Sequence, residues 1–179
     1  MKRIIFTCGL IAGIIISCVL VYAAVLCYGR EDFQGNMVIG YASMLIAFSL
    51  IYVGVKKFRD KQNGEIISFG KAFKVGLFIT LVASTVYVAV WLVCYYCFVP
   101  DFMDKYADHI IRQAKQKGVS QPELSKTIHD MDRYREMYKN PFFVVLLTYM
   151  EVLPVGLLVS LVTALLLKRK QRNDVPAAA

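Results

Sequence analysis

The sequence predicts an all-α integral membrane protein with four transmembrane helices and an outer amphipathic helical hairpin between the third and the fourth. Three observations lead to this fold class. The 179-residue chain is 58% hydrophobic, which is more than a soluble domain of this length needs. Its apolar residues are gathered into four long runs, and its basic residues are gathered between only some of those runs. We therefore expect one membrane domain over residues 1–179.

The four predicted spans follow from length and charge. A helix rises about 1.5 Å per residue, so about 20 residues cross a hydrocarbon core about 30 Å thick. Each apolar run meets this length, and the last contains one charged residue, Glu151. The opening MKR and the run after it also resemble a signal peptide, but the run continues to Tyr28, so we expect it to be retained. The spans are placed at about residues 4–28, 37–55, 72–99 and 142–167.

Basic residues are distributed unequally between the connecting segments. Twelve lysines and arginines fall at the Met1 end, in segment 56–74 and in tail 168–179, against three acidic residues, while the other connections carry equal numbers of both signs. Because lysine and arginine near span ends stay in the cytoplasm, both termini and segment 56–74 are predicted to be cytoplasmic. Anionic lipid headgroups on that side then account for the net charge of +8, and we expect no nucleic-acid partner.

The cytoplasmic segment between the second and third spans has turn and capping signals. Asn63-Gly64 is typical of a tight turn, and Ser68 is expected to cap the third helix. Phenylalanines alternate with lysines here, which suits a backbone that lies among lipid headgroups. We favour such an anchor over a loop specific for one lipid or for a nucleotide.

Segment 101–139 is predicted to form an extracytoplasmic helical hairpin. Apolar residues recur at helical spacing on both sides of Gly118. Ser120 followed by Glu123 has the pattern of a capping box at the start of the second helix. We expect the apolar side of the hairpin to lie on the bundle or on the outer leaflet.

The hairpin contains both histidines of the chain. An antiparallel hairpin brings Asp108-His109 level with His129-Asp130. Imidazole and carboxylate groups could together hold a metal ion. The histidines flank the apolar stripes instead of facing each other, so we predict solvated side chains and no metal site.

Glu151 is the candidate functional residue of the spans. A carboxylate in lipid costs about 3 kcal/mol at the centre of a span, so it should face the bundle interior. Pro154 removes the hydrogen bond to the carbonyl of Met150 and is expected to kink the helix. Matching depth along the other spans predicts a polar cluster around Glu151, which is either a structural hydrogen-bond site or a proton or ligand site. Its members are Tyr22, Ser43, Ser84 and Tyr87, with Ser17 and Arg30 nearby.

Cys94 and Cys97 form a CxxC pair near the outer end of the third span. Such a pair suggests a membrane thiol oxidoreductase. The helix C-terminus disfavours a thiolate, however, and the outer side has no second cysteine pair to relay electrons. Buried apolar cysteines are therefore the preferred interpretation.

Two further patterns are interpreted as packing features. Gly9 and Gly13, and the series Gly156, Ser160 and Ala164, form small-residue stripes that let helices approach closely within one chain or between copies. The aromatic residues near the outer ends of the spans are typical of a belt at the lipid surface, with no catalytic meaning. They are Tyr28, Trp91, Tyr95, Tyr96, Phe142 and Phe143.

Three blocks resemble a known family. They are GYASMLIAFSLIYVGVKKFRDKQNGEIISFGKAFKVGLFI, FVPDFMDKYA and YMEVLPVGLLVSLVTALLLKRK. They are similar to the small bacterial four-helix membrane proteins called domain of unknown function 4199, over about residues 4–170. The resemblance implies a four-helix protein of the bacterial inner membrane, without a known reaction, substrate or cofactor. It also suggests that Phe69-Gly70-Lys71 and the Glu151, Pro154, Gly156 series are family features.

The sequence thus predicts a multi-pass, non-enzymatic protein of the bacterial inner membrane that acts through helix packing or protein partners. We predict no catalytic residue, metal or cofactor. The expected partners are the lipid bilayer, with anionic headgroups on the cytoplasmic side, and either a second copy or another membrane protein. The alternatives are a transporter or channel component that uses Glu151, and a thiol oxidoreductase that uses Cys94 and Cys97.

Overall fold

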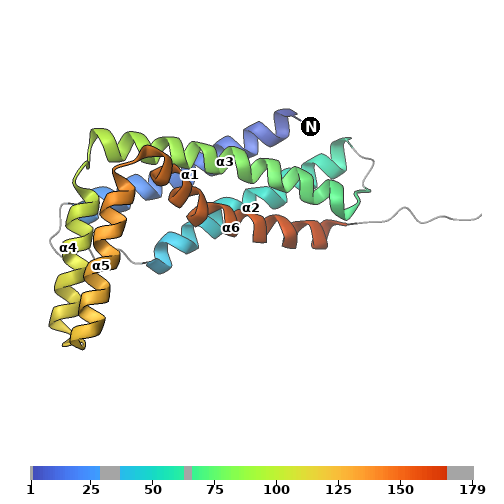
Figure 1. The fold of residues 1–179 in the computed structure, drawn as a ribbon. Helices are drawn as coiled ribbons and strands as arrows, with labels where there is room; N and C mark the ends of the chain where they lie inside the picture. Colours follow the sequence, from blue (N-terminus) through green and yellow to red (C-terminus); the bar gives the residue numbers. More distant parts are fainter. Residues whose placement is uncertain (1, 29–36, 63–65, 169–179) are drawn as a thin grey trace, which may run out of the picture.

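The computed structural model describes residues 2–28, 37–62 and 66–168, and every regular element within these ranges is a helix (Figure 1). Four of the helices are long and apolar enough to cross a membrane, which confirms the predicted fold class. The other two form the predicted shorter hairpin. The elements are α1 (Lys2–Tyr28), α2 (Met37–Gln62), α3 (Phe69–Cys97), α4 (Phe102–Gln116), α5 (Gln121–Tyr138) and α6 (Pro141–Leu167).

The four long helices form one bundle. Helix α3 packs against α1 and α6, and α2 contacts all three of them. The core that they enclose is filled by Phe48, Ile51, Val55 and Ile79, none of which is exposed. The outward-facing surface of these helices carries many exposed large apolar side chains, as expected of a surface that contacts lipid.

Helix α2 is longer than its predicted span. It continues seven residues past Val55, to Gln62, and so carries lysines and an arginine that were expected in a loop. These residues are good helix formers, so the helix does not end where the apolar run ends. Phe58 on this extension is buried, and the ammonium group of Lys71 lies 5.7 Å from the centre of its ring. Ser68 caps α3 as predicted, with its hydroxyl accepting from the backbone N–H of Lys71 at 3.4 Å.

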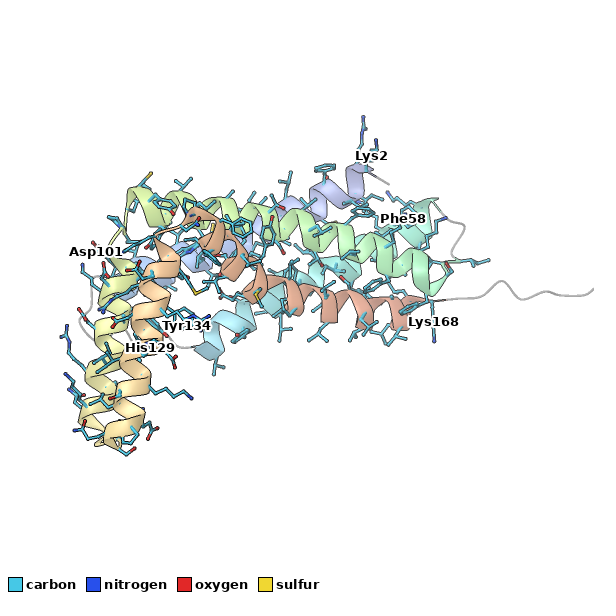
Figure 2. The ribbon with its side chains drawn as sticks, viewed as in Figure 1. Lys2, Phe58, Asp101, His129, Tyr134 and Lys168 are labelled. Carbon is cyan, nitrogen blue, oxygen red and sulfur yellow. The ribbon has the colours of Figure 1, made fainter. Side chains whose placement is uncertain are left out.

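The basic residues and the hairpin lie at opposite ends of the bundle. Lys2, Phe58 and Lys168 are at one end, which we call the basic end, and Asp101 and His129 are at the other, the hairpin end (Figure 2). The chain starts α1 and α3 at the basic end and ends α2 and α6 there. The described lysines and arginines of the four long helices therefore all lie at the basic end, while the hairpin carries basic and acidic residues of its own.

Both small-residue stripes pack against α3. A Cβ atom at Gly9 would lie 2.7 Å from Val82, and one at Gly13 would lie 2.8 Å from Val86. On the other side of α3, Ser160 is fully buried, donates to the carbonyl of Gly156 at 2.8 Å, and lies 3.1 Å from the Thr80 hydroxyl. Because Ser160 has one proton, Thr80 is the donor of the bond between them. The stripes thus serve close packing within this chain.

Helices α4 and α5 lie side by side, across the direction of the bundle (Figure 1). The turn between them contains Gly118 with φ of 65°, a conformation that favours glycine. Ser120 occupies the predicted N-cap position of α5, but its side chain accepts no cap hydrogen bond, so the predicted capping box is wrong. Pro122 lies at the second helical position and has no N–H, which removes one of the two donors that such a cap uses.

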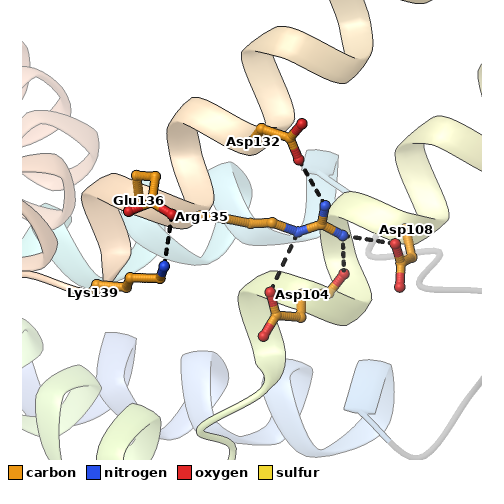
Figure 3. A network of polar contacts seen from close by, with 6 residues as sticks. All are labelled: Asp104, Asp108, Asp132, Arg135, Glu136 and Lys139. Carbon is orange, nitrogen blue, oxygen red and sulfur yellow. Dashed lines mark hydrogen bonds and ion pairs between the residues drawn. The ribbon is translucent and has the colours of Figure 1, made fainter.

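One arginine joins the two helices of the hairpin (Figure 3). The guanidinium of Arg135 on α5 contacts the carboxylates of Asp108 at 2.7 Å and Asp132 at 2.9 Å. Its Nε lies 3.3 Å from a carboxylate oxygen of Asp104, and its Nη2 donates to the Asp104 carbonyl at 3.4 Å. Three carboxylates from both helices therefore surround one cation.

A second cluster of polar side chains joins the end of α1 to the start of α4. The Tyr28 hydroxyl donates to Asp101 at 2.6 Å, and the Lys105 ammonium lies 3.1 Å from the same carboxylate and 3.7 Å from the centre of the Tyr28 ring. The hydrogen bond from Tyr28, and then the one from Lys105, lower the pKa of Asp101. Because the pKa of Asp101 is lower in the folded protein than in the unfolded chain, its ionised carboxylate stabilises the fold above the ordinary pKa of about 3.9. This stabilisation is lost as the pH falls through the folded-state pKa.

We expect the Tyr28→Phe variant to raise the pKa of Asp101 toward its ordinary value, because it removes the stronger of the two hydrogen bonds and keeps the ring. Carbon NMR of the Asp101 carboxyl during an acid titration measures this directly. Lys105→Met should raise the same pKa by a smaller amount. An unchanged titration of Asp101 in the phenylalanine variant would show that the Tyr28 bond does not form in solution.

Candidate functional site

A pocket of about 490 Å³ lies where the hairpin meets the bundle. Its walls come from five helices: α1, α3 and α6 of the bundle, and α4 and α5 of the hairpin. The described residues that line it are Leu20, Tyr87, Trp91, Phe102, Met103, Tyr106, Met131, Tyr134, Tyr138, Leu147, Thr148 and Glu151. Glu151 is the one acidic or basic side chain in this set, and the rest are aromatic or aliphatic apart from Thr148.

Glu151 faces this pocket from the middle of α6. Its side chain is exposed, and it lines the pocket. The Tyr87 hydroxyl points at its Oε1 from α3, at 3.5 Å, which is a long hydrogen bond. Pro154 follows within the same helix and is exposed, and α6 bends along its length (Figure 1). Among the described residues, the carboxylate therefore has one weak donor, the Tyr87 hydroxyl, and an open side.

Aromatic rings form much of the pocket wall, and they come in pairs four residues apart. Tyr87 and Trp91 are such a pair on α3, and Tyr134 and Tyr138 are one on α5. Residues four apart lie on the same face of a helix, so both rings of each pair reach the pocket. Phe102 and Tyr106 on α4 follow the same spacing. The Trp91 ring meets the Phe102 ring edge to face, with 5.4 Å between their centres.

The surroundings of Tyr138 raise the pKa of its phenol. Burial raises the pKa of its phenol to about 12, and the negative charge of Glu151 contributes in the same direction. The hydroxyl is therefore neutral at any physiological pH and presents a donor and an uncharged ring to its surroundings.

The predicted polar cluster is only partly assembled. Tyr87 contacts Glu151 as expected, and Ser84 lies fully buried one turn before it, with no hydrogen-bond partner for its hydroxyl among the described residues. Ser43 donates to the carbonyl of Gly40 and does not line the pocket. Tyr22 is 67% exposed on the outside of α1 and lies away from it. Arg30 falls outside the described residues.

The cysteine pair lies apart from this pocket. Cys94 is buried with Ala24, Trp91 and Tyr95 under the hairpin, whereas Cys97 is exposed at the end of α3. Both are free thiols. The lining residues of the pocket include neither of them.

The aromatic belt was predicted wrongly for two residues. Tyr96 and Phe142 are exposed as expected, at 45% and 67%, but Trp91 and Tyr95 are each only 6% exposed. The hairpin covers them: Trp91 contacts Phe102, and Tyr95 contacts Tyr138 with 5.5 Å between ring centres. The sequence does contain one signal for the pocket. Helices α3, α4 and α5 each carry two aromatic residues four positions apart, and residues at that spacing lie on the same face of a helix.

The two histidine pairs of the hairpin do not form a metal site in the described part of the chain. No group of three histidine, cysteine or acidic side chains there is close enough to hold an ion. Asp108 contributes its carboxylate to Arg135 instead. Asp104 and Asp108 thus serve the ionic contacts that join α4 to Arg135 of α5.

Comparison with known proteins identifies a family. A family model described as Protein of unknown function (DUF4199) matches residues 7–169. A search of curated proteins and a search of solved structures found no match. The pocket, the Glu151 carboxylate and both hairpin helices lie within the matched region.

Proposed function

Because this chain belongs to the DUF4199 family, whose function is unknown, we propose a role from the site itself: a multi-pass membrane protein that is not an enzyme and that binds a ligand in the Glu151 pocket. The observation that carries the proposal is the open side of the carboxylate. A charged group in a span is costly and is normally paired within the bundle. Here it faces a pocket of ligand size instead, since pockets of about 300–1,000 Å³ hold small molecules.

The proposed orientation places this pocket on the outer side of a bacterial inner membrane. Its support is that the described lysines and arginines of the four long helices lie at the basic end, because basic residues near span ends stay in the cytoplasm. The lysines of α2 and α3 would then meet anionic headgroups. Ligand would reach Glu151 from the outer aqueous side or from the outer leaflet.

Binding fits the structure better than conduction. On the basic side of the pocket the bundle core is closed by Phe48, Ile51 and Val55, all with no exposed surface. One observation favours transport as a second candidate: Pro154 interrupts the hydrogen bonds of α6 within one turn of Glu151, which gives that helix a point at which it can bend. The buried thiol of Cys94 favours packing over redox chemistry.

The proposal predicts that filling the pocket removes an occupant. Met131 is half-buried on α5 and lines the pocket, so Met131→Trp should occupy part of the volume. We expect mass spectrometry of the purified protein to find a small molecule or lipid retained by the wild type and depleted in this variant. Ile46→Trp is the matched control, because Ile46 is 70% exposed on the outside of α2. Identical sets of retained molecules in all three proteins would contradict a ligand-binding role.

A further inference from the structure

The pocket combines a carboxylate with aromatic faces, and this combination selects the charge of its ligand. We propose that the Glu151 pocket binds an organic cation, that is, an ammonium or similar cationic group attached to an apolar body. This inference rests on the proposed binding function and goes beyond it by naming the class of ligand. It concerns the side chains of Glu151, Tyr87, Trp91, Tyr134 and Tyr138.

The first argument is charge. The Tyr87 hydroxyl satisfies one acceptor position of Glu151 through a long bond of 3.5 Å, while a carboxylate has about four such positions. Every other described lining residue is uncharged. A cation near the open side of the carboxylate would offset the cost of placing its charge in a span, whereas an anion would add to that cost.

The second argument is the aromatic wall. A cation over the face of a tryptophan or tyrosine ring is attracted by the ring quadrupole, and several rings together form the cage that recognises quaternary ammonium groups. Trp91 and Tyr87 supply rings from α3, and Tyr134 and Tyr138 supply rings from α5. The walls therefore attract the same charge as Glu151 does.

The third argument is the size and the donor set. The pocket volume of about 490 Å³ suits an organic molecule. Hard metal cations take six or more oxygen ligands, and the described lining residues provide one carboxylate. Leu20, Met103 and Leu147 would cover the apolar body of an amphiphilic cation. The same chemistry is offered by a free organic cation and by the amine headgroup of a lipid.

The chain contains its own reporter for the test. Trp91 is the only tryptophan, and it lines the pocket, so its fluorescence reports occupancy. The probes are tetraphenylphosphonium and tetraphenylborate, which match in size and shape and differ in the sign of their charge. Both are titrated into the intact protein in dodecyl maltoside micelles.

We expect tetraphenylphosphonium to change the Trp91 emission saturably, and Glu151→Gln to weaken its binding by about tenfold, equivalent to about 1.4 kcal/mol. Tetraphenylborate should give no saturable change. Glu136→Gln is the matched control, because Glu136 is an exposed glutamate of the hairpin paired with Lys139 at 2.6 Å. Tyr134→Leu, which removes one ring and keeps the carboxylate, should weaken the phosphonium ion less than Glu151→Gln does.

The outcomes separate this inference from the binding function itself. Met131→Phe, which adds bulk to the pocket wall, tests whether an ion binds in the pocket. If both ions bind equally and this variant blocks both, cation selectivity is overturned and a general ligand pocket is left. Undiminished phosphonium binding in a folded Glu151→Gln protein would also overturn it. Failure of both ions to bind would overturn it too. Competition by added phosphatidylethanolamine, but not by phosphatidylglycerol, would identify the source of the cation as a lipid amine, and absence of such competition would identify a free organic cation.

Discussion

Replacing Gly156 by alanine is expected to destabilise the bundle although alanine is the better helix former. A Cβ atom at this position would overlap Cγ2 of Thr80 and lie 3.0 Å from its Oγ1. Thr80 has no room to move, because it is fully buried and its hydroxyl donates to Ser160. Extra volume in a packed core costs about 1–3 kcal/mol.

Gly40→Ala is the matched control for this change. A Cβ atom at Gly40 on α2 would have no neighbour within 4 Å, so it gains helix propensity without a clash. The thermal midpoint of Gly156→Ala, measured in detergent, should fall below that of Gly40→Ala by about 2–12 °C, given about 2–4 °C per kcal/mol for a chain of this size. Gly156→Leu should yield no monodisperse protein. Equal midpoints for the two alanine variants would show that α3 and α6 are not packed as closely as the structure has them.

Removing the guanidinium of Arg135 is expected to loosen the hairpin. Arg135→Gln would leave the carboxylates of Asp104, Asp108 and Asp132 close together without their cation. Single exposed ion pairs contribute about 0–1 kcal/mol, but this one cation serves three carboxylates and joins two helices. A loss of about 1 kcal/mol in local stability corresponds to an equilibrium constant for local opening that is about fivefold larger.

Hydrogen exchange of the α4 and α5 amides measures that opening. Arg133→Gln is the control, since it makes the same charge change at an exposed position two residues away. Arg135→Lys should give an intermediate rate, because lysine keeps the charge and loses the planar fork that reaches several carboxylates. Exchange that is as slow in Arg135→Gln as in Arg133→Gln would contradict a joining role for Arg135. Helix α5 also contributes Tyr134 and Tyr138 to the pocket, so the contacts of Arg135 that hold α5 against α4 help to position these two rings.

The sequence determined the helices because of how the backbone behaves in lipid. A chain without water must satisfy its own N–H and C=O groups, so long apolar runs form spanning helices whatever their detailed order. The hairpin was predictable for a different reason: its exposed helices have apolar and polar faces, and Gly118 marks the turn between them. Glu151 stood out as a candidate because a carboxylate in an apolar run is costly, so that either a structural hydrogen bond or a functional site must account for it.

The tertiary structure alone decided what surrounds Glu151. Spans such as α6 are apolar on all sides, so their sequence does not indicate which face meets another helix and which meets lipid. For that reason Tyr22 was expected near Glu151 and lies outside, whereas Trp91 was expected at the lipid surface and lines the pocket. The pocket exists because the hairpin packs against one end of the bundle and brings rings from α4 and α5 to those of α3. The four-residue spacing marks which rings share a face of their own helix, but it does not say which helices meet.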